Sequence, residues 1–186
     1  LSDARYCAGM RVDVIGFNLN LNDQNCLDVE LLKAITQWIQ GPKIAGEFDD
    51  MALEPIQTYL SQVDLDIIET SNSSLLAPLS ETGKKIYFKI NIDDIISEEE
   101  LLNKIKEGRI ADKIVICRST INKTQTVIPS LPHSTHSEQM INGFNLELDQ
   151  LHLWPAIEIL ATTEDKPGFK DYGEIMDILE FIEDHE

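Results

Sequence analysis

The chain has 186 residues, of which 42% are hydrophobic and 26% are charged. This composition is typical of a globular protein large enough to bury a sizeable core. The formal net charge is -18 and the pI is about 4.4. Such a negative field repels nucleic-acid phosphates and anionic membrane surfaces, which argues against a nucleic-acid-binding or membrane-binding protein. A well-solvated acidic surface accounts for this charge.

The cysteines also limit the class of protein. Cys7, Cys26 and Cys117 are scattered, with no Cys-x-x-Cys pair and no Cys/His spacing typical of a metal site. We therefore expect no bound metal or cofactor, and a reduced, cytoplasmic protein. No apolar run approaches the ~20 residues of a membrane span, and no signal peptide is visible.

Helical patterns alternate with short apolar runs, many of them β-branched. The first element, at residues 2–10, is an expected short helix with no strand before it. The expected strands are residues 12–18, 43–48, 65–70, 85–90, 113–117, 138–141 and 156–160. The other expected helices lie at residues 28–39, 51–61, within 73–80, at 97–106, near 146 and from 171 onward.

Three of these helices begin with a capping signal. Asp28 is the expected N-cap of the helix at 28–39. Ser97 with Glu100, and Asp171 with Glu174, have the spacing of a capping box, in which two side chains satisfy the first free backbone N–H groups.

Several segments together carry the pattern of one known family. Residues 1–20 read LSDARYCAGMRVDVIGFNLN, residues 65–70 read LDIIET, residues 111–117 read ADKIVIC and residues 141–151 read INGFNLELDQL. Residues 155–184 add an apolar run, a PG-x-KD motif and a final amphipathic helix. This set resembles the phosphoribosylanthranilate isomerases, which are (β/α)8 barrels of tryptophan biosynthesis, over nearly the whole chain.

The alternation and the resemblance lead to the same fold. Strands separated by helices predict repeated βα units and a parallel sheet, so the class is α/β. A (β/α)8 TIM barrel needs eight strands, and seven are visible. We expect one barrel domain over residues 1–186 whose first strand is missing, upstream of Leu1. Residues 119–137 are expected to form a long irregular connection.

The resemblance also implies where the family's chemistry would lie. That chemistry, an Amadori rearrangement, needs a general base, a general acid and a phosphate grip. The general acid corresponds to Cys117, a family arginine corresponds to Asn25, and the base lies on the strand upstream of the sequence. A neutral thiol is a weak substitute for a carboxylic acid.

The phosphate would lie on backbone N–H groups of two loops near the end of the chain. The resemblance places these loops at Asn142 and Gly143 and at Thr162 and Thr163, where the family's glycines are mostly replaced. The catalytic and phosphate-binding residues of the family are therefore largely not retained.

Charged residues inside apolar strand runs are a second candidate site. Glu47, Glu69, Lys89 and Glu158 stand inside such runs, and Arg118 directly follows one. A buried charge must pair or reach water, and both can happen at the mouth of a barrel, where active sites lie. One interpretation is a pocket for an anionic ligand at Lys89 and Arg118, or for a hard cation at the glutamates. The other is a set of ion pairs that fills the lumen.

Three functions follow from these observations. The first is a phosphoribosylanthranilate isomerase-like protein whose small-molecule ligand is a sugar phosphate. The second is a non-catalytic or re-purposed barrel that binds a small molecule or a protein partner. The third is a different lyase or isomerase that uses the glutamates and the lysine of the mouth. We expect a monomer or a homodimer in each case.

Overall fold

A computed structural model describes residues 2–117, 140–143, 148, 151, 154–161 and 171–184. The chain divides into two compact units, Leu1–Ile114 and Val115–Glu186. The first unit contains the helices α1 (Ser2–Gly9), α2 (Val29–Thr36), α3 (Leu53–Leu60), α4 (Leu76–Ser80) and α5 (Glu98–Glu107). It also contains the strands β1 (Val14–Asn18), β2 (Lys43–Glu47), β3 (Ile67–Thr70) and β4 (Lys85–Asn91), and the start of β5 (Lys113–Cys117).

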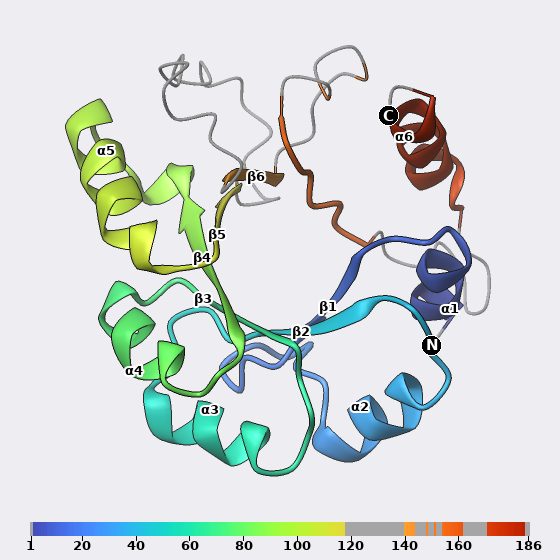
Figure 1. Ribbon diagram of the computed structural model, residues 1–186, viewed down its shortest axis with the longest axis horizontal. Helices are drawn as coiled ribbons and strands as arrows, with labels where there is room; N and C mark the ends of the chain where they lie inside the picture. The colour runs from blue at the N-terminus through green and yellow to red at the C-terminus, as the bar shows by residue number, and fades with distance from the viewer. Residues whose placement is uncertain are drawn as a thin grey trace. The chain divides into compact units, whose positions relative to one another are not determined.

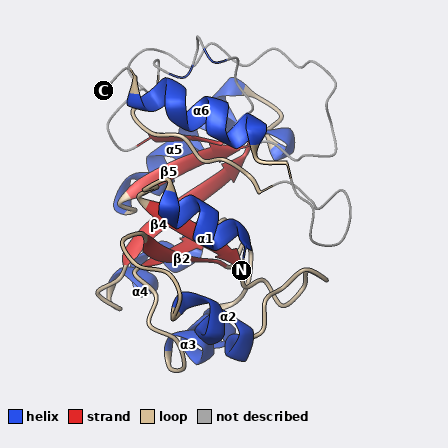
Figure 2. Cartoon of the chain, turned by 90° about the vertical axis from the view of Figure 1, so that its right-hand side faces the viewer, coloured by secondary structure: helices blue, strands red, loops and turns tan. Residues whose placement is uncertain are grey.

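The strands of the first unit form a parallel sheet in chain order, and β5 begins beside β4. Figure 1 shows the sheet curving, with α2, α3 and α4 along its outer side. In Figure 2, α1 lies in front of the strands on the side that faces the viewer. This arrangement is the α/β class expected from the alternating pattern, with helices covering one face of a curved parallel sheet.

The helices begin largely where the capping signals predict. Asp28 is the N-cap of α2, and its carboxylate accepts the backbone N–H of Leu31 at 2.8 Å. Ser97 is the N-cap of α5, and its hydroxyl accepts the N–H of Glu100 at 3.2 Å. The Glu100 carboxylate accepts the N–H of Ile96 at 3.0 Å, so both side chains satisfy free donors of the first turn.

Alternate residues of the strands define the two faces of the sheet. In β4, Ile86, Phe88 and Ile90 are buried, whereas the other residues of the strand are half-buried or, at Lys85, exposed. A Cβ atom on Gly108, at the end of α5, would touch the ring of Phe88, so the buried residues face the helices. On β1 the helix-facing residues are Ile15 and Phe17. The even-numbered residues of β1 and the odd-numbered residues of β4 therefore share the other, inner face.

Two aspartates join neighbouring strands near the N-terminal ends of the strands. The Asp66 carboxylate, just before β3, accepts the N–H of Ile44 in β2 at 2.8 Å. The Asp112 carboxylate, just before β5, accepts the N–H of Ile86 in β4 at 2.7 Å. Each aspartate also donates its own N–H to the carbonyl of the same isoleucine, at 2.9 and 2.8 Å. Each pair of bonds closes one strand–helix–strand segment.

In the second unit, β6 (Met140–Gly143) follows β5 in the sheet order, and α6 (Gly173–Glu183) is the last helix. Ile141, Leu151 and Ile175 are buried in this unit, as are the last three residues of β5. The expected helix near residue 146 and the expected connection at 119–137 lie outside the described residues.

Two expectations for the second unit are wrong. The apolar run at 156–160 forms a single bridge at Ile157 rather than a strand, and its residues are half-buried or, at Leu160, exposed. A short apolar run does not by itself determine strand pairing. The final helix begins at Gly173 with Tyr172 at its N-cap, and no side chain caps it. Asp171 instead accepts the N–H of Gly173 at 2.8 Å, a local turn that competes with a cap in the same sequence.

No helix among the described residues combines the length and the apolar character needed to cross a membrane.

We predict that Asp112→Ala lowers the free energy of unfolding by about 1.5–3 kcal/mol, because the Ile86 N–H loses a charged acceptor. Urea unfolding followed by circular dichroism measures the change. Asp64→Ala is the matched control, because Asp64 is 95% exposed and pairs with Lys84 at the surface, and we expect a change of about 0.5 kcal/mol or less. Equal effects of the two substitutions would contradict a structural role for Asp112.

Candidate functional site

The parallel register aligns one row of inner-face residues across four strands. Asn18 in β1 pairs with Glu47 in β2, Glu47 pairs with Glu69 in β3, and Glu69 pairs with Tyr87 in β4. Since residues in register on parallel strands point to the same face, all four side chains belong to the inner face. The row lies near the C-terminal ends of the strands, the end of a parallel α/β sheet at which ligands usually bind.

Lys89, two residues beyond Tyr87 on the same face of β4, pairs with both glutamates of the row. Its Nζ lies 2.8 Å from Glu69 Oε1 and 3.9 Å from Glu47 Oε2. The side chains of Glu69, Lys89 and Glu47 are 6%, 15% and 26% exposed. Poorly hydrated charges of this kind persist when they are paired, and the short bond to Glu69 supplies that pairing.

Gly16 provides the room for Glu47. A Cβ atom on Gly16 would collide with the carboxylate of Glu47, so this carboxylate leans over the backbone of the neighbouring strand. Gly16 is exposed, and its φ angle needs no glycine, so the close approach of the carboxylate is the reason for the missing side chain.

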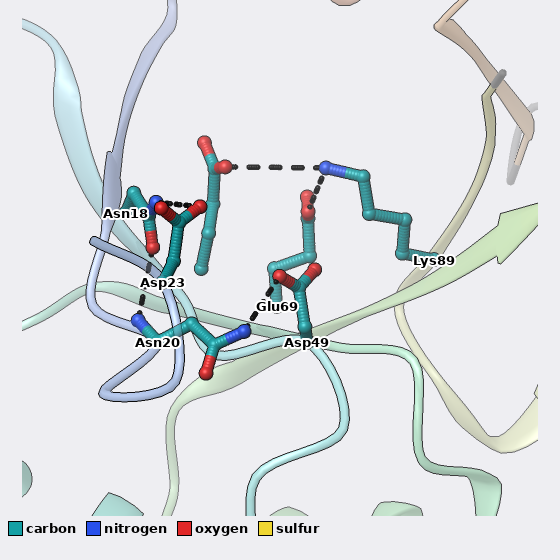
Figure 3. A network of polar contacts seen from close by, with 7 residues as sticks. Asn18, Asn20, Asp23, Asp49, Glu69 and Lys89 are labelled. Atoms are coloured by element: carbon teal, nitrogen blue, oxygen red, sulfur yellow. Dashed lines mark hydrogen bonds and ion pairs between the residues drawn. The ribbon is translucent and has the colours of Figure 1, made fainter. Parts of the chain in front are cut away.

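A second polar group lies in the loops that follow β1 and β2. Asn18 donates from Nδ2 to Asp23 Oδ2 at 2.9 Å, and its Oδ1 accepts the N–H of Asn20 at 3.0 Å. Asn20 donates from Nδ2 to Asp49 Oδ2 at 3.1 Å. Figure 3 shows Asn18, Asn20, Asp23 and Asp49 pointing toward one another, with Glu69 and Lys89 close by. We call the set Asn18, Asn20, Asp23, Glu47, Asp49, Glu69 and Lys89 the strand-end cluster.

The surroundings of two side chains in and beside the cluster, Asp23 and Tyr87, shift their pKa values. The N–H of Asn25 and then the amide of Asn18 lower the pKa of Asp23, so this carboxylate stays ionised at neutral pH. Burial, and then the carboxylates of Asp112, Asp13 and Glu69, raise the pKa of Tyr87. The phenol in register with Glu69 is therefore neutral at neutral pH and able to donate a hydrogen bond.

The structure describes four of the five predicted pocket residues. Glu47, Glu69 and Lys89 come together in the first unit. Glu158 is half-buried in the segment 154–161 of the second unit. Arg118 lies outside the described residues.

The residues that correspond to the family's chemistry lie mostly in the second unit. Cys117 is the last residue of β5 and is buried. Asn142 and Gly143 are the last two residues of β6, whereas Thr162 and Thr163 lie outside the described residues. Asn25, in the first unit, donates its N–H to Asp23 Oδ1 at 2.8 Å.

Four residues of the site, Gly16, Asn20, Asp23 and Asp49, were not predicted from the sequence. Polar residues placed directly after two expected strands were the available signal, since such ends meet at one edge of a parallel sheet. The contact between Asn20 and Asp49 joins residues 29 positions apart, which no local pattern reveals.

Similar solved structures are phosphoribosylanthranilate isomerases. The enzyme from Thermus thermophilus matches with a TM-score of 0.73 and 11% identity, over 100% of this chain and 94% of its own. The enzyme from Thermotoga maritima matches with a TM-score of 0.75 and 14% identity, over 99% and 94%. The one from Pyrococcus furiosus matches with a TM-score of 0.68 and 12% identity, over 98% and 94%. At these identities the likeness shows a shared fold alone.

No protein-family model matches the chain, and no curated protein matches it in sequence.

We predict that Gly16→Ala and Glu47→Ala are coupled. In the parent chain, Gly16→Ala displaces the Glu47 carboxylate from its place beside Lys89 and should be destabilising. In the Glu47→Ala background the colliding atoms are absent, and the same change should be neutral or stabilising. A double-mutant cycle measured by urea unfolding should give a coupling of about 1 kcal/mol. Additive effects would show that Glu47 does not occupy the space above Gly16.

We also predict that Lys89→Met is strongly destabilising, by about 3–5 kcal/mol, because it leaves two poorly hydrated carboxylates beside each other. Thermal and urea unfolding measure the loss. The matched control Lys84→Met makes the same charge change near the opposite end of β4, where Lys84 pairs with the exposed Asp64, and it should cost about 1 kcal/mol or less. Adding Glu69→Met to Lys89→Met should recover much of the loss, and failure to recover it would argue against the ion pair as its cause.

Proposed function

We propose that the two units form one (β/α)8-type barrel domain resembling the phosphoribosylanthranilate isomerases, and that this barrel is re-purposed. In this proposal the strand-end cluster binds a small polar molecule, and the chain does not catalyse the Amadori rearrangement. The binding site lies where barrels of this type place their ligands, at the C-terminal ends of the strands.

The observation that carries this proposal is the pairing of Lys89. Its ammonium already has a carboxylate partner at 2.8 Å and a second at 3.9 Å. Asp23 and Asp49 add further negative charge in the neighbouring loops. A ligand bearing phosphate or carboxylate groups would have to compete with these carboxylates for the ammonium. The arrangement favours an uncharged or cationic ligand whose hydroxyl or amino groups donate to the carboxylates.

The residue at the general-acid position supports the same view. Cys117 ends β5 and is buried. A buried thiol donates hydrogen bonds weakly and is a poor proton donor to a sugar oxygen at neutral pH. The family resemblance provides no other described residue for this role.

The second candidate function is a working sugar-phosphate isomerase of tryptophan biosynthesis. The fold match over nearly the whole chain favours it. One of the matching structures was solved with reduced 1-(o-carboxyphenylamino)-1-deoxyribulose 5-phosphate. For this chain the same chemistry would need Cys117 as its acid and a phosphate grip near Asn142, Gly143, Thr162 and Thr163.

The proposal also includes a reduced, cytoplasmic location and a monomeric or homodimeric state. The isomerase from Thermotoga maritima, which shares the fold, is described as dimeric. Sedimentation equilibrium of the purified chain measures its oligomeric state.

An activity assay separates the two functions. We expect purified chain to convert phosphoribosylanthranilate no faster than buffer, and Cys117→Asp alone to restore no turnover, because the other family positions have also changed. Turnover well above buffer in the parent chain, lost in Cys117→Ala, would establish the isomerase instead.

Calorimetry tests the class of ligand. We expect ribose or ethanolammonium to bind more tightly than ribose 5-phosphate, because the Lys89 ammonium is already paired with Glu69 and Glu47 and a phosphate would have to compete with them. Tighter binding of ribose 5-phosphate, abolished in the Lys89→Met/Glu69→Met double variant, which should recover most of the stability, and kept by the control Lys84→Met, would contradict the proposal and support an anion site at Lys89.

A further inference from the structure

Asp49 has an unusual backbone conformation for a residue other than glycine. Its φ angle is 48°, in the left-handed region, and it is the first central residue of the turn closed by the bond from Met51 N–H to Phe48 O. Most side chains are strained in this region, glycine is the residue that such turns usually carry, and aspartate and asparagine are the side chains that tolerate it best. A left-handed residue with a polar side chain beside a candidate site suggests a role for that side chain.

The contacts of Asp49 join three strand ends. The residue itself follows β2, and its carboxylate accepts from Asn20, in the loop after β1, at 3.1 Å. Its carbonyl oxygen accepts the hydroxyl of Thr70, the last residue of β3, and the N–H of Ser71, both at 2.8 Å. Thr70 is fully buried and Asn20 is 8% exposed, so water is a poor substitute for these bonds.

The loop held in this way is residues 19–27. Asn20 accepts the N–H of Asn22 at 3.0 Å through the same side chain that donates to Asp49. The N–H of Leu21 points to the sulfur of Met51, in the same turn as Asp49, at 3.3 Å. The loop also carries Asp23, a member of the strand-end cluster. Asp49 therefore sets the place of a loop that contributes charge to the site.

We propose that Asp49 is a positioning residue of the strand-end cluster: it holds the loop 19–27 against the ends of β2 and β3 and so fixes the site's polar groups before a ligand arrives. This inference rests on the proposed function for its use in binding. A loop fixed in advance lowers the entropy lost when a ligand is bound.

Hydrogen exchange on the ligand-free protein tests the proposal, with Asp49→Gly and Asp49→Asn as a matched pair. Glycine relieves the left-handed strain but removes the acceptor for Asn20, whereas asparagine tolerates φ > 0 and keeps an acceptor oxygen. We expect Asp49→Gly to melt near the parent's temperature while the amides of Leu21 and Asn22 exchange about tenfold faster, the change expected for one lost bond to a carboxylate. Asp49→Asn should keep most of the parent's protection.

Exchange in α5, remote from this turn, serves as the internal reference and should be the same in all three proteins. Asn20→Ala removes the other partner of the bond and should loosen the amide of Leu21, which tests the proposal even if Asp49→Gly fails to fold. The Asn22 amide is left out of this comparison because the substitution also removes its own acceptor. Unchanged protection of the loop in Asp49→Gly or in Asn20→Ala, or equal loosening by Asp49→Asn, would overturn it. Because no ligand is present, these outcomes are independent of whether the proposed ligand class is right.

Discussion

The pairing of one poorly hydrated ammonium with two carboxylates is the constraint around which the inner face is arranged. Lys89 lies on the fourth strand, β4, and its ammonium reaches Glu69 on β3 at 2.8 Å and Glu47 on β2 at 3.9 Å. Parallel register brings the glutamates together, and the absence of a side chain at Gly16 leaves room for one of them. Loss of the ammonium would leave like charges side by side, so the residues of this group depend on one another.

The same pairing of charges explains why a shared fold need not mean a shared ligand. The chain shares its fold with isomerases at 9–14% identity, which leaves the side chains of the inner face free to differ. A site built on carboxylates around a neutralised lysine has different preferences from a phosphate grip built on backbone N–H groups at helix starts. Fold similarity therefore constrains where a ligand would bind in this chain more than which ligand it would be.

The structure could be predicted from the sequence where the signal lies within a few neighbouring residues. Asp28 and Ser97 cap helices because a side-chain oxygen and a backbone N–H a few residues on are brought together by the helix itself. Asp171 carries the same signal, yet its oxygen bonds Gly173 in a turn, since both outcomes use the same atoms. The charged residues Glu47, Glu69 and Lys89 were identifiable as exceptions in apolar strands. The contact between Asn20 and Asp49 could not be predicted, because it depends on the conformation of two loops and on the left-handed backbone of Asp49.

The two aspartate bonds at the other end of the sheet bear on how the chain reaches this fold. Asp66 and Ile44 are 22 residues apart, and Asp112 and Ile86 are 26 apart, each pair spanning one strand–helix–strand segment. Contacts of short sequence separation cost little loop-closure entropy and form early in folding. Each segment can thus act as a folding unit that closes by itself. The inner-face charges, which need several strands in register, would then be assembled late, on a sheet whose order is already set.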